Sequence, residues 1–213
     1  NTEERSEEAN TEERSEEATV LEVRIHGRGG QGAVFASKVL AAAIFEEGKF
    51  VQCFPAFGVE RRGAPVAAYL RIDDRFIHLR TGITHPDHVV LLDARLLGVA
   101  PVTEGLKPDG IVLINSSGAP SDFRDLEGYR VYTIDANRIA VAHGLGSRNA
   151  PIINTVMSGA FLRISGLAGV ESLAAAIRAE LPTDAEANIA ASDQAYREIE
   201  FSLPQASAGS LDV

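Results

Sequence analysis

The feature that most constrains the fold is a glycine-rich loop, Gly27–Gly32 (GRGGQG), between a strand pattern and a helix pattern. The preceding segment, Thr19–Gly27, alternates apolar and polar residues, as a half-buried strand does. The following segment, Ala33–Gly48, has apolar residues at helical spacing and closes on a glycine, a common helix terminator. About Phe50–Phe54 a second strand is indicated. Together these segments predict a βαβ unit with a right-handed crossover.

The rest of the chain continues to alternate strand and helix patterns. Ala64–Ile72 and Arg75–Leu79 are predicted to form a β-hairpin across Asp73 and Asp74. Short apolar runs indicate buried parallel strands at His88–Asp93, Gly110–Ser117 and Tyr129–Asp135. Helices are expected at Ala136–Leu145, Ile152–Ile164, Val170–Leu181 and Glu186–Phe201. The predicted fold class is α/β: an open, mostly parallel Rossmann-like sheet covered by helices, with an inserted β-hairpin.

The first eighteen residues differ from the remainder in composition. Asn1–Ala9 reads NTEERSEEA, and Asn10–Ala18 repeats it. The segment has no apolar residue larger than alanine that could pack in a core. It is therefore expected to be a solvated helix or disordered. We therefore divide the chain into a flexible, acidic, duplicated segment (1–18), a single domain (19–204) and a tail (205–213).

Charge and composition exclude several classes of function. The formal net charge of -10 disfavours binding to nucleic acid or to an anionic membrane surface. The longest apolar stretch, about Val34–Phe45, is too short to cross a bilayer, and no secretory signal is evident, so a cytoplasmic location is expected. The one cysteine, Cys53, excludes a disulfide within the chain and an all-cysteine iron–sulfur cluster held by this chain alone.

The loop spacing Gly27-x-Gly29-x-x-Gly32 is that of a dinucleotide fingerprint. Glycines allow a tight turn, and a helix N-terminus favours negative charge. A dinucleotide site also needs Asp or Glu at the end of the second strand, where residues 52–55 are Gln, Cys, Phe and Pro. Three interpretations remain: a dinucleotide site, a tight turn that packs the helix on the sheet, or a contact with a phosphate-bearing ligand or partner subunit, to which Arg28 adds positive charge.

A second unusual stretch, Phe54–Val66, follows the second strand and contains the adjacent pair Arg61 and Arg62. In an open α/β sheet this position faces the ligand, beside the glycine loop. Arginine can bind phosphate or carboxylate through two parallel hydrogen bonds. The alternative is a solvated or interface loop.

Other polar residues are interpreted as structural. Asp93 ends a buried strand and is expected to cap the following turn, with Arg61 or Arg62 as an alternative partner. His85 and His88 lack a third metal ligand, and His26 is expected to be a packed histidine. No metal-binding residue is therefore predicted.

Three ordered motifs carry a resemblance to a known family: GRGGQG (Gly27–Gly32), FGVERRGAPV (Phe57–Val66) and NTVMSGAF (Asn154–Phe161). At these motifs the chain resembles the gamma subunits of the 2-oxoacid:ferredoxin oxidoreductases, which act on pyruvate, 2-oxoglutarate, branched-chain and aryl 2-oxoacids. The resemblance spans about Val20–Leu181. One departure is Ser158-Gly159, where the family usually has leucine and glycine.

The resemblance implies a subunit of a multi-subunit enzyme that decarboxylates a 2-oxoacid oxidatively to acyl-CoA and passes the electrons to ferredoxin or NAD. Thiamine diphosphate, Mg and [4Fe-4S] clusters belong to its partners, the thiamine-binding alpha and beta subunits and a ferredoxin-like delta subunit. It implies no catalytic residue in this chain and no activity of the chain alone. Contacts with coenzyme A or a partner subunit are expected at Gly27, Arg28, Gly29, Gly30, Gln31, Gly32, Arg61 and Arg62. The alternatives are a free-standing Rossmann-type nucleotide-binding reductase and a structural scaffold.

Overall fold

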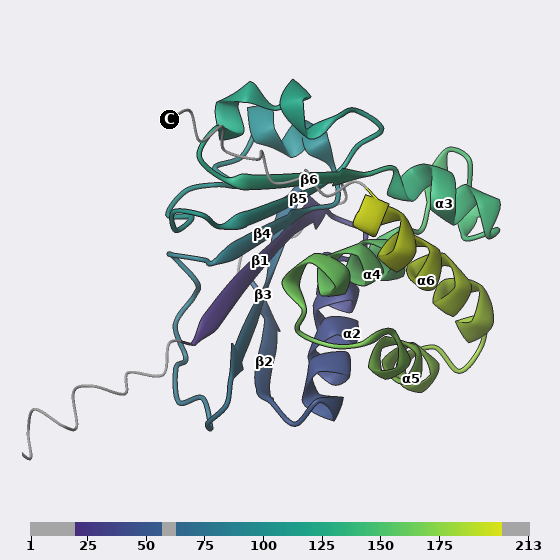
Figure 1. The fold of residues 1–213 in the computed structure, drawn as a ribbon, viewed down its shortest axis with the longest axis horizontal. Coiled ribbons are helices and arrows are strands. Elements are labelled where there is room, and N and C mark those ends of the chain that lie inside the picture. The colour runs from purple at the N-terminus through teal and green to yellow at the C-terminus, as the bar shows by residue number, and fades with distance from the viewer. Residues whose placement is uncertain (1–19, 57–62, 202–213) are drawn as a thin grey trace, which may run out of the picture.

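The computed structural model describes residues 20–56 and 63–201 of the chain. The duplicated segment (1–18), the tail (205–213) and the pair Arg61 and Arg62 lie outside the described residues. Figure 1 shows one twisted sheet with helices packed against it.

The sheet has six strands in the order β2-β3-β1-β4-β5-β6. Strands β1, β4, β5 and β6 are parallel to one another, and β3 is antiparallel to both of its neighbours, β1 and β2. The predicted α/β fold with a mostly parallel sheet is therefore confirmed. The strands are β1 Leu21–Arg28, β2 Phe50–Pro55, β3 Pro65–Asp73, β4 His88–Leu91, β5 Ile111–Asn115 and β6 Arg130–Ile134.

The predicted simple βαβ unit is wrong in one respect, because β2 does not lie beside β1. Strand β3 lies between them and pairs with all eight residues of β1, from Leu21 opposite Ile72 to Arg28 opposite Pro65. Since β2 and β3 follow each other in the chain and are antiparallel, they also pair with each other. The unit that contains the glycine loop is thus a split βαβ unit with an antiparallel strand in the middle.

The predicted hairpin partner Arg75–Leu79 forms no strand. Both edges of β3 are already occupied by β1 and β2, so no edge is left for a third strand. The Asp73 carboxylate instead accepts a hydrogen bond from the Arg75 N–H (2.9 Å), and the Gln52 amide donates to the Ile77 carbonyl (2.9 Å). A small antiparallel hairpin does occur later in the chain, where β7 (Gly146–Ser147) pairs with β8 (Ala150–Pro151).

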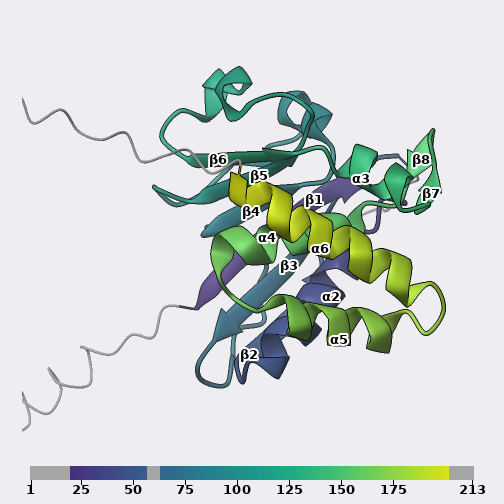
Figure 2. The same cartoon turned by 45° about the vertical axis from the view of Figure 1, so that its right-hand side comes forward.

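The α-helices gather on one face of the sheet (Figures 1 and 2), and short 3-10 segments cover the other face of β4, β5 and β6. The helices are α2 Ala33–Glu46, α3 Ala136–Ala142, α4 Asn154–Ser165, α5 Val170–Glu180 and α6 Ala185–Phe201. The 3-10 segments are η1 Ala94–Gly98, η2 Pro120–Asp122 and η3 Arg124–Leu126. Within the described parts of the chain, no helix combines the length and the apolar character needed to cross a membrane.

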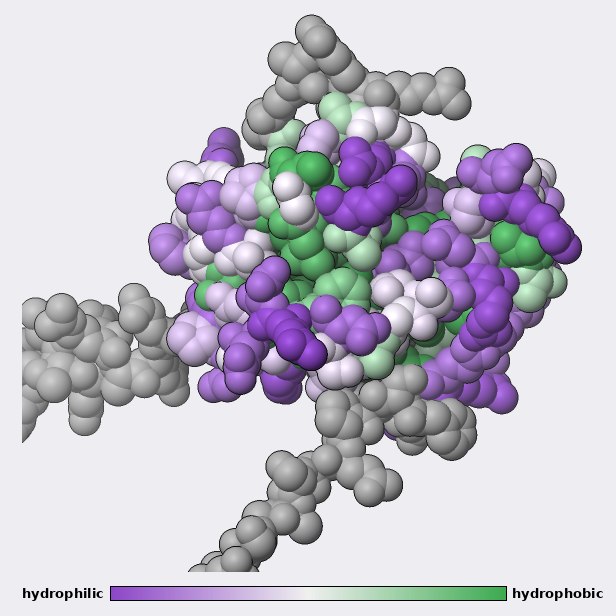
Figure 3. Space-filling view, turned by 90° about the horizontal axis from the view of Figure 1, so that it is seen from above, coloured by the Kyte–Doolittle hydropathy of each residue, from purple (hydrophilic) through white to green (hydrophobic). Residues whose placement is uncertain are grey.

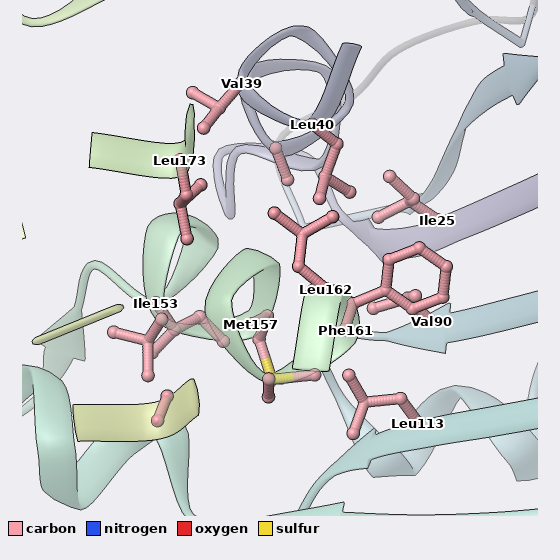
Figure 4. Packing of buried hydrophobic residues seen from close by; sticks show 14 of the residues in the cluster. Ile25, Val39, Leu40, Val90, Leu113, Ile153, Met157, Phe161, Leu162 and Leu173 are labelled. Atoms are coloured by element: carbon pink, nitrogen blue, oxygen red, sulfur yellow. The ribbon is translucent and has the colours of Figure 1, made fainter. Parts of the chain in front are cut away.

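Helix α4 lies at the centre of the main core. Figure 4 shows Met157, Phe161 and Leu162 of this helix between α2 and the strands. All three side chains are buried, and full burial of one such side chain contributes roughly 1.5–3 kcal/mol. A Cβ atom on Gly159 would lie 2.2 Å from the Ser192 carbonyl oxygen of α6. Gly159 therefore lets the backbones of α4 and α6 approach closely. This glycine follows the family pattern, and only its neighbour Ser158 departs from it.

The face of β1 and β3 that points away from the helices carries charged residues. Arg71 is 1% exposed, and its guanidinium donates to the Glu22 carboxylate across the two strands (2.7 Å). The guanidinium of Arg71 also lies over the aromatic ring of Phe54, with 5.4 Å between the guanidinium carbon and the ring centroid. Arg24, on the same face, donates from Nη2 to the carbonyl of Val102 (3.0 Å).

Candidate functional site

A cavity of about 920 Å³ lies at the edge of the sheet where the parallel strands end. Its walls come from the segments that follow β1, β4, β5 and β6, and from the β7–β8 hairpin and the start of α4. This is the edge at which ligands bind in open α/β sheets, and it is where the glycine loop was expected to act. The cavity is lined by Gly29–Gly32, Leu92–Arg95, Asn115, Asn137 and Arg148–Asn154.

The glycine loop is fixed by its own backbone and by the segment that precedes β3. The Gly29 N–H donates to the Ala64 carbonyl (2.9 Å), and the Gly63 N–H donates to the Gly29 carbonyl (3.1 Å). The Gln31 side-chain oxygen accepts from the Arg28 N–H (2.7 Å). Two of the four loop glycines, Gly30 and Gly32, have positive φ angles, which other residues rarely adopt.

Among the residues that the structure describes, no side chain caps the N-terminus of α2. Gly32 is the N-cap residue, it has no side chain to accept a hydrogen bond, and the first turn contains no acidic residue. The first helical hydrogen bond runs from the Ala36 N–H to the Gly32 carbonyl (2.9 Å). The N–H groups before Ala36 therefore have no acceptor within the helix, and they give this end of the cavity a partial positive charge.

An ion-pair cluster lies beside the loop. One Asp93 carboxylate oxygen accepts from Arg28 Nε (2.8 Å) and from Arg95 Nη2 (2.8 Å), and the other accepts from the Arg95 N–H (3.0 Å). Hydrogen bonds from Arg95 and Arg28 lower the pKa of Asp93 to about 2. The prediction that Asp93 caps the following turn is confirmed. Its arginine partners are Arg28 and Arg95; the suggested partners Arg61 and Arg62 lie outside the described residues.

Two asparagines connect the elements around the cavity. Buried Asn115 donates to the Leu92 carbonyl (3.0 Å) and accepts from the Ala136 N–H (3.1 Å), so it ties the ends of β4 and β5 to the start of α3. Asn154 begins α4, and its Nδ2 atom would lie 2.5 Å from a Cβ atom on Gly32. The first and third sequence motifs, far apart in the chain, therefore meet at this contact.

The β7–β8 hairpin contributes residues that sequence reasoning missed. Figure 2 shows it projecting beside α3, and its turn residues, Arg148 and Asn149, line the cavity. Gly146 has a φ of +75°, and the Ser147 hydroxyl oxygen accepts from the Ala150 N–H (3.2 Å). The signal available in the sequence was the run of glycine, serine and asparagine between two helix patterns, which is typical of a turn.

The histidines do not contribute to this cavity. Burial, together with the nearby Arg24 charge, lowers the pKa of His26 to about 4, so its ring is neutral at pH 7. This agrees with the expected packed histidine. His88 accepts from the Ile111 N–H at 3.3 Å. In residues 20–56 and 63–201 no three His, Cys, Asp or Glu side chains are grouped so that they could hold a metal ion.

A second hollow, of about 770 Å³, lies along the open edge of β6. The side of the molecule seen from above, where β6 and the 3-10 segments lie, has a hydrophobic area within hydrophilic surroundings (Figure 3). The hollow contains none of the three sequence motifs, and its lining residues are Pro120, Ser121, Phe123, Arg124 and Leu126–Tyr132.

Comparisons with known proteins agree on one family. The Pyruvate ferredoxin/flavodoxin oxidoreductase family matches residues 22–198. The chain is 49% identical over 182 residues to pyruvate synthase subunit PorC of Methanothermobacter thermautotrophicus, covering 85% of this chain and 97% of that protein. It is 44% identical over 185 residues to the pyruvate/ketoisovalerate oxidoreductases common subunit gamma of Pyrococcus furiosus, covering 85% and 98% of the two chains.

The fold is also similar to a solved structure. The crystal structure of pyruvate oxidoreductase subunit PORC from Thermotoga maritima superposes with a TM-score of 0.71 at 36% sequence identity, covering 84% of this chain and 96% of that chain. The predicted resemblance is therefore confirmed by sequence and by fold. The chain belongs to the pyruvate ferredoxin/flavodoxin oxidoreductase family, as a subunit of the gamma type.

Proposed function

We propose that this gamma-type subunit binds coenzyme A in the 920 Å³ cavity for an enzyme complex that oxidises a 2-oxoacid to acyl-CoA. The diphosphate of coenzyme A lies at the glycine loop and the N-terminus of α2. The complex passes the electrons to ferredoxin or NAD. The observation that carries the proposal is the uncapped N-terminus of α2 at the wall of the cavity.

The charged side chains that line the cavity are basic on balance. Its charged lining residues are Asp93, Arg95 and Arg148, and the carboxylate of Asp93 already holds two arginines. The chain as a whole has a net charge of -10, so the excess of positive charge is confined to the lining of this cavity. Free helix N–H groups and arginines suit phosphate oxygens, which accept hydrogen bonds and are negatively charged.

A dinucleotide site fits the cavity less well. Recognition of a ribose in such a site uses a free carboxylate at the end of a neighbouring strand. Asp93 occupies such a place, at the end of β4 beside β1, but its oxygens accept from Arg28 and Arg95. This favours a ligand whose phosphates, rather than its ribose hydroxyls, are recognised here.

The redox groups of the complex are assigned to partner subunits. Thiamine diphosphate with Mg supplies the carbanion chemistry, and [4Fe-4S] clusters carry electrons. This chain has one cysteine, and its described residues form no metal-binding group, so they do not fit a cluster. The partners we propose are thiamine-binding alpha and beta subunits and a ferredoxin-like delta subunit.

The role of Arg61 and Arg62 is part of the same proposal. They belong to the segment between Ala56 and Gly63, and the Gly63 N–H is bonded to the glycine loop. We propose that this segment contacts coenzyme A or a partner subunit, together with Gly27–Gly32. Within the loop, the Arg28 side chain acts through its ion pair with Asp93 and positions the backbone.

The test is steady-state kinetics of the reconstituted complex with Gly32→Val in this subunit. A side chain at Gly32 collides with Asn154 and requires φ of +84°. We expect the KM for coenzyme A to rise at least about tenfold, the size of one lost charge-assisted contact. The KM for the 2-oxoacid should not change.

The matched control is Gly48→Val. Gly48 lies at the other end of α2, has a φ of +83° and has no atom within 4 Å of an added Cβ. It tests backbone strain without a change at the cavity, and both KM values should equal those of the unmodified complex. An unchanged KM for coenzyme A in an assembled Gly32→Val complex would falsify the proposal.

A further inference from the structure

Among the charged residues of the cavity, Arg148 differs in having no partner within residues 20–56 and 63–201. Arg95 pairs with Asp93, and Arg28 beside it does the same. Arg148 is exposed, and it forms neither an ion pair nor a hydrogen bond with any residue in the parts of the chain that the structure describes. The cavity thus has one arginine whose five N–H donors are available to a ligand.

The hairpin holds the backbone of Arg148 in a defined place. The Ile152 N–H donates to the Leu145 carbonyl (3.1 Å) and closes the base of the hairpin. At Gly146 an added Cβ would lie 2.4 Å from the Ala150 carbonyl oxygen, so the two strands approach each other more closely than a side chain permits. A short two-stranded hairpin is barely stable by itself. These two features fix its turn at the wall of the cavity.

Coenzyme A carries two separate anionic groups, a diphosphate and a phosphomonoester on the 3′ oxygen of the ribose. The cavity has two separate donor groups, the backbone at the start of α2 and the guanidinium of Arg148. Backbone N–H groups that a glycine loop leaves accessible suit a diphosphate, which lies within a chain of atoms. A phosphomonoester is terminal, carries about -1.5 to -2 charges at pH 7 and matches the planar fork of an arginine.

We propose that Arg148 binds the 3′-phosphate and is the residue that makes this subunit prefer coenzyme A over dephospho-coenzyme A. This rests on the proposed function of the cavity and adds a specificity-determining residue to it. The arginine contacts the end of the ligand that does not react. Its effect therefore falls on the choice and affinity of the thiol substrate.

The experiment compares coenzyme A and dephospho-coenzyme A as substrates of the reconstituted complex. In Arg148→Ala, the KM for coenzyme A should rise about tenfold, as expected for the loss of one charge-assisted contact. The KM for dephospho-coenzyme A should not change, so the preference between the two should disappear. Arg148→Lys should retain part of the preference, because it keeps the charge and loses the fork.

Two further variants make the result specific. Gly146→Ala keeps the Arg148 side chain but distorts the hairpin that positions it, and should reduce the same preference. Arg124→Ala removes an equal charge from an exposed position on η3, at the β6 edge, and should leave both KM values unchanged.

The inference is overturned if Arg148→Ala raises both KM values equally, since Arg148 would then contact a part common to both thiols. It is also overturned if both values stay as in the unmodified complex. The Gly32→Val complex separates this outcome from failure of the proposed function. If that variant raises the KM for coenzyme A and Arg148→Ala leaves the preference intact, only the role of Arg148 is wrong.

Discussion

Helix α2 is bounded by two glycines with nearly the same backbone conformation, Gly32 with φ of +84° and Gly48 with φ of +83°. At the C-terminal end the chain satisfies its own carbonyls, since the N–H groups of Glu47 and Gly48 donate to Ile44 and Phe45. At the N-terminal end no side chain among the described residues caps the helix. The same conformation thus closes one end of α2 and leaves the other open to the cavity.

The carboxylates near the two ends of α2 also differ in what they bind. Near Gly48, Glu47 accepts hydrogen bonds from the Gly169 N–H and the Ser172 hydroxyl, which lowers the pKa of its exposed carboxyl. In the cavity beside Gly32 the carboxylate is that of Asp93. It pairs with Arg28 and Arg95 and accepts no hydrogen bond from the N–H groups at the start of α2. The end at which we propose a ligand site differs from the other end in its backbone donors, which donate to no side chain among the described residues. The glycine conformation alone does not identify it.

The largest expected effect on stability comes from alanine at Gly32. The variant must place a side chain in the left-handed region, at about 1–2 kcal/mol, and collide with Asn154. We expect Gly32→Ala to lower the free energy of unfolding of the full chain by about 2–3 kcal/mol, and Gly48→Ala to lower it by about 1 kcal/mol. Urea-induced unfolding measures both.

The double variant Gly32→Ala with Asn154→Ala isolates the collision. Removing the Asn154 side chain should bring the cost of Gly32→Ala close to that of Gly48→Ala. Equal costs for the two single variants would mean that the surroundings of Gly32 do not distinguish the two ends.

The second effect depends on pH. The pKa of Asp93 in the folded chain, about 2, is below the ordinary value of 3.8 for this carboxyl. The carboxylate therefore stabilises the folded chain above about pH 4, and this contribution is lost as the pH falls towards 2. After allowance for the exposure of Arg95, we expect Asp93→Asn to cost about 1–2 kcal/mol at pH 7. The cost should become small as the pH falls to 2, where the carboxylate is about half protonated in the folded chain.

Thermal or urea unfolding between pH 2 and pH 7 measures this difference. Glu47→Gln serves as the comparison at the other end of α2, where the carboxylate is exposed, and its effect should be smaller at every pH. A cost of Asp93→Asn that is constant with pH would contradict the ion-pair explanation.

The smallest effect has opposite signs for stability and for binding. Gln31→Glu keeps an oxygen to accept from the Arg28 N–H and adds a negative charge beside the open end of α2. It should raise the free energy of unfolding by about 0.5 kcal/mol through the helix dipole. The same charge should weaken coenzyme A binding in the complex. Titration of coenzyme A, with Gln52→Glu as the control, tests this; stronger binding would show that the helix end does not face the anion.

Much of the fold could be predicted because its signals are local. The alternation before Gly27, the helical spacing after Gly32 and the apolar runs of β4, β5 and β6 are each encoded within a few residues. The helix bounds agree within a few residues, for example Asn154–Ser165 against the predicted Ile152–Ile164. The capping role of Asp93 was also predictable, since an acidic residue at the end of a strand before a turn has a local effect.

The wrong or missing predictions concern contacts between residues that are far apart in the sequence. Nothing within Pro65–Asp73 indicates that it pairs with both β1 and β2, because that depends on which edges are free. The same applies to Arg95 and Arg148, whose place at the cavity follows from where the sheet brings their segments. The contact of Gly32 with Asn154 joins positions that no local pattern connects.

The buried pair of Arg71 and Glu22 has a consequence for how the sheet is assembled. The two residues lie opposite each other in β1 and β3, on the face away from the helices. Successive residues of a strand point to opposite faces, so a slip of β3 by one residue would turn Arg71 towards the apolar core beneath α2 and α4. An unpaired charge there costs several kcal/mol. The pair therefore adds an energetic cost to a shifted pairing of β3 with β1 and favours the register on which the strand ends at the cavity depend.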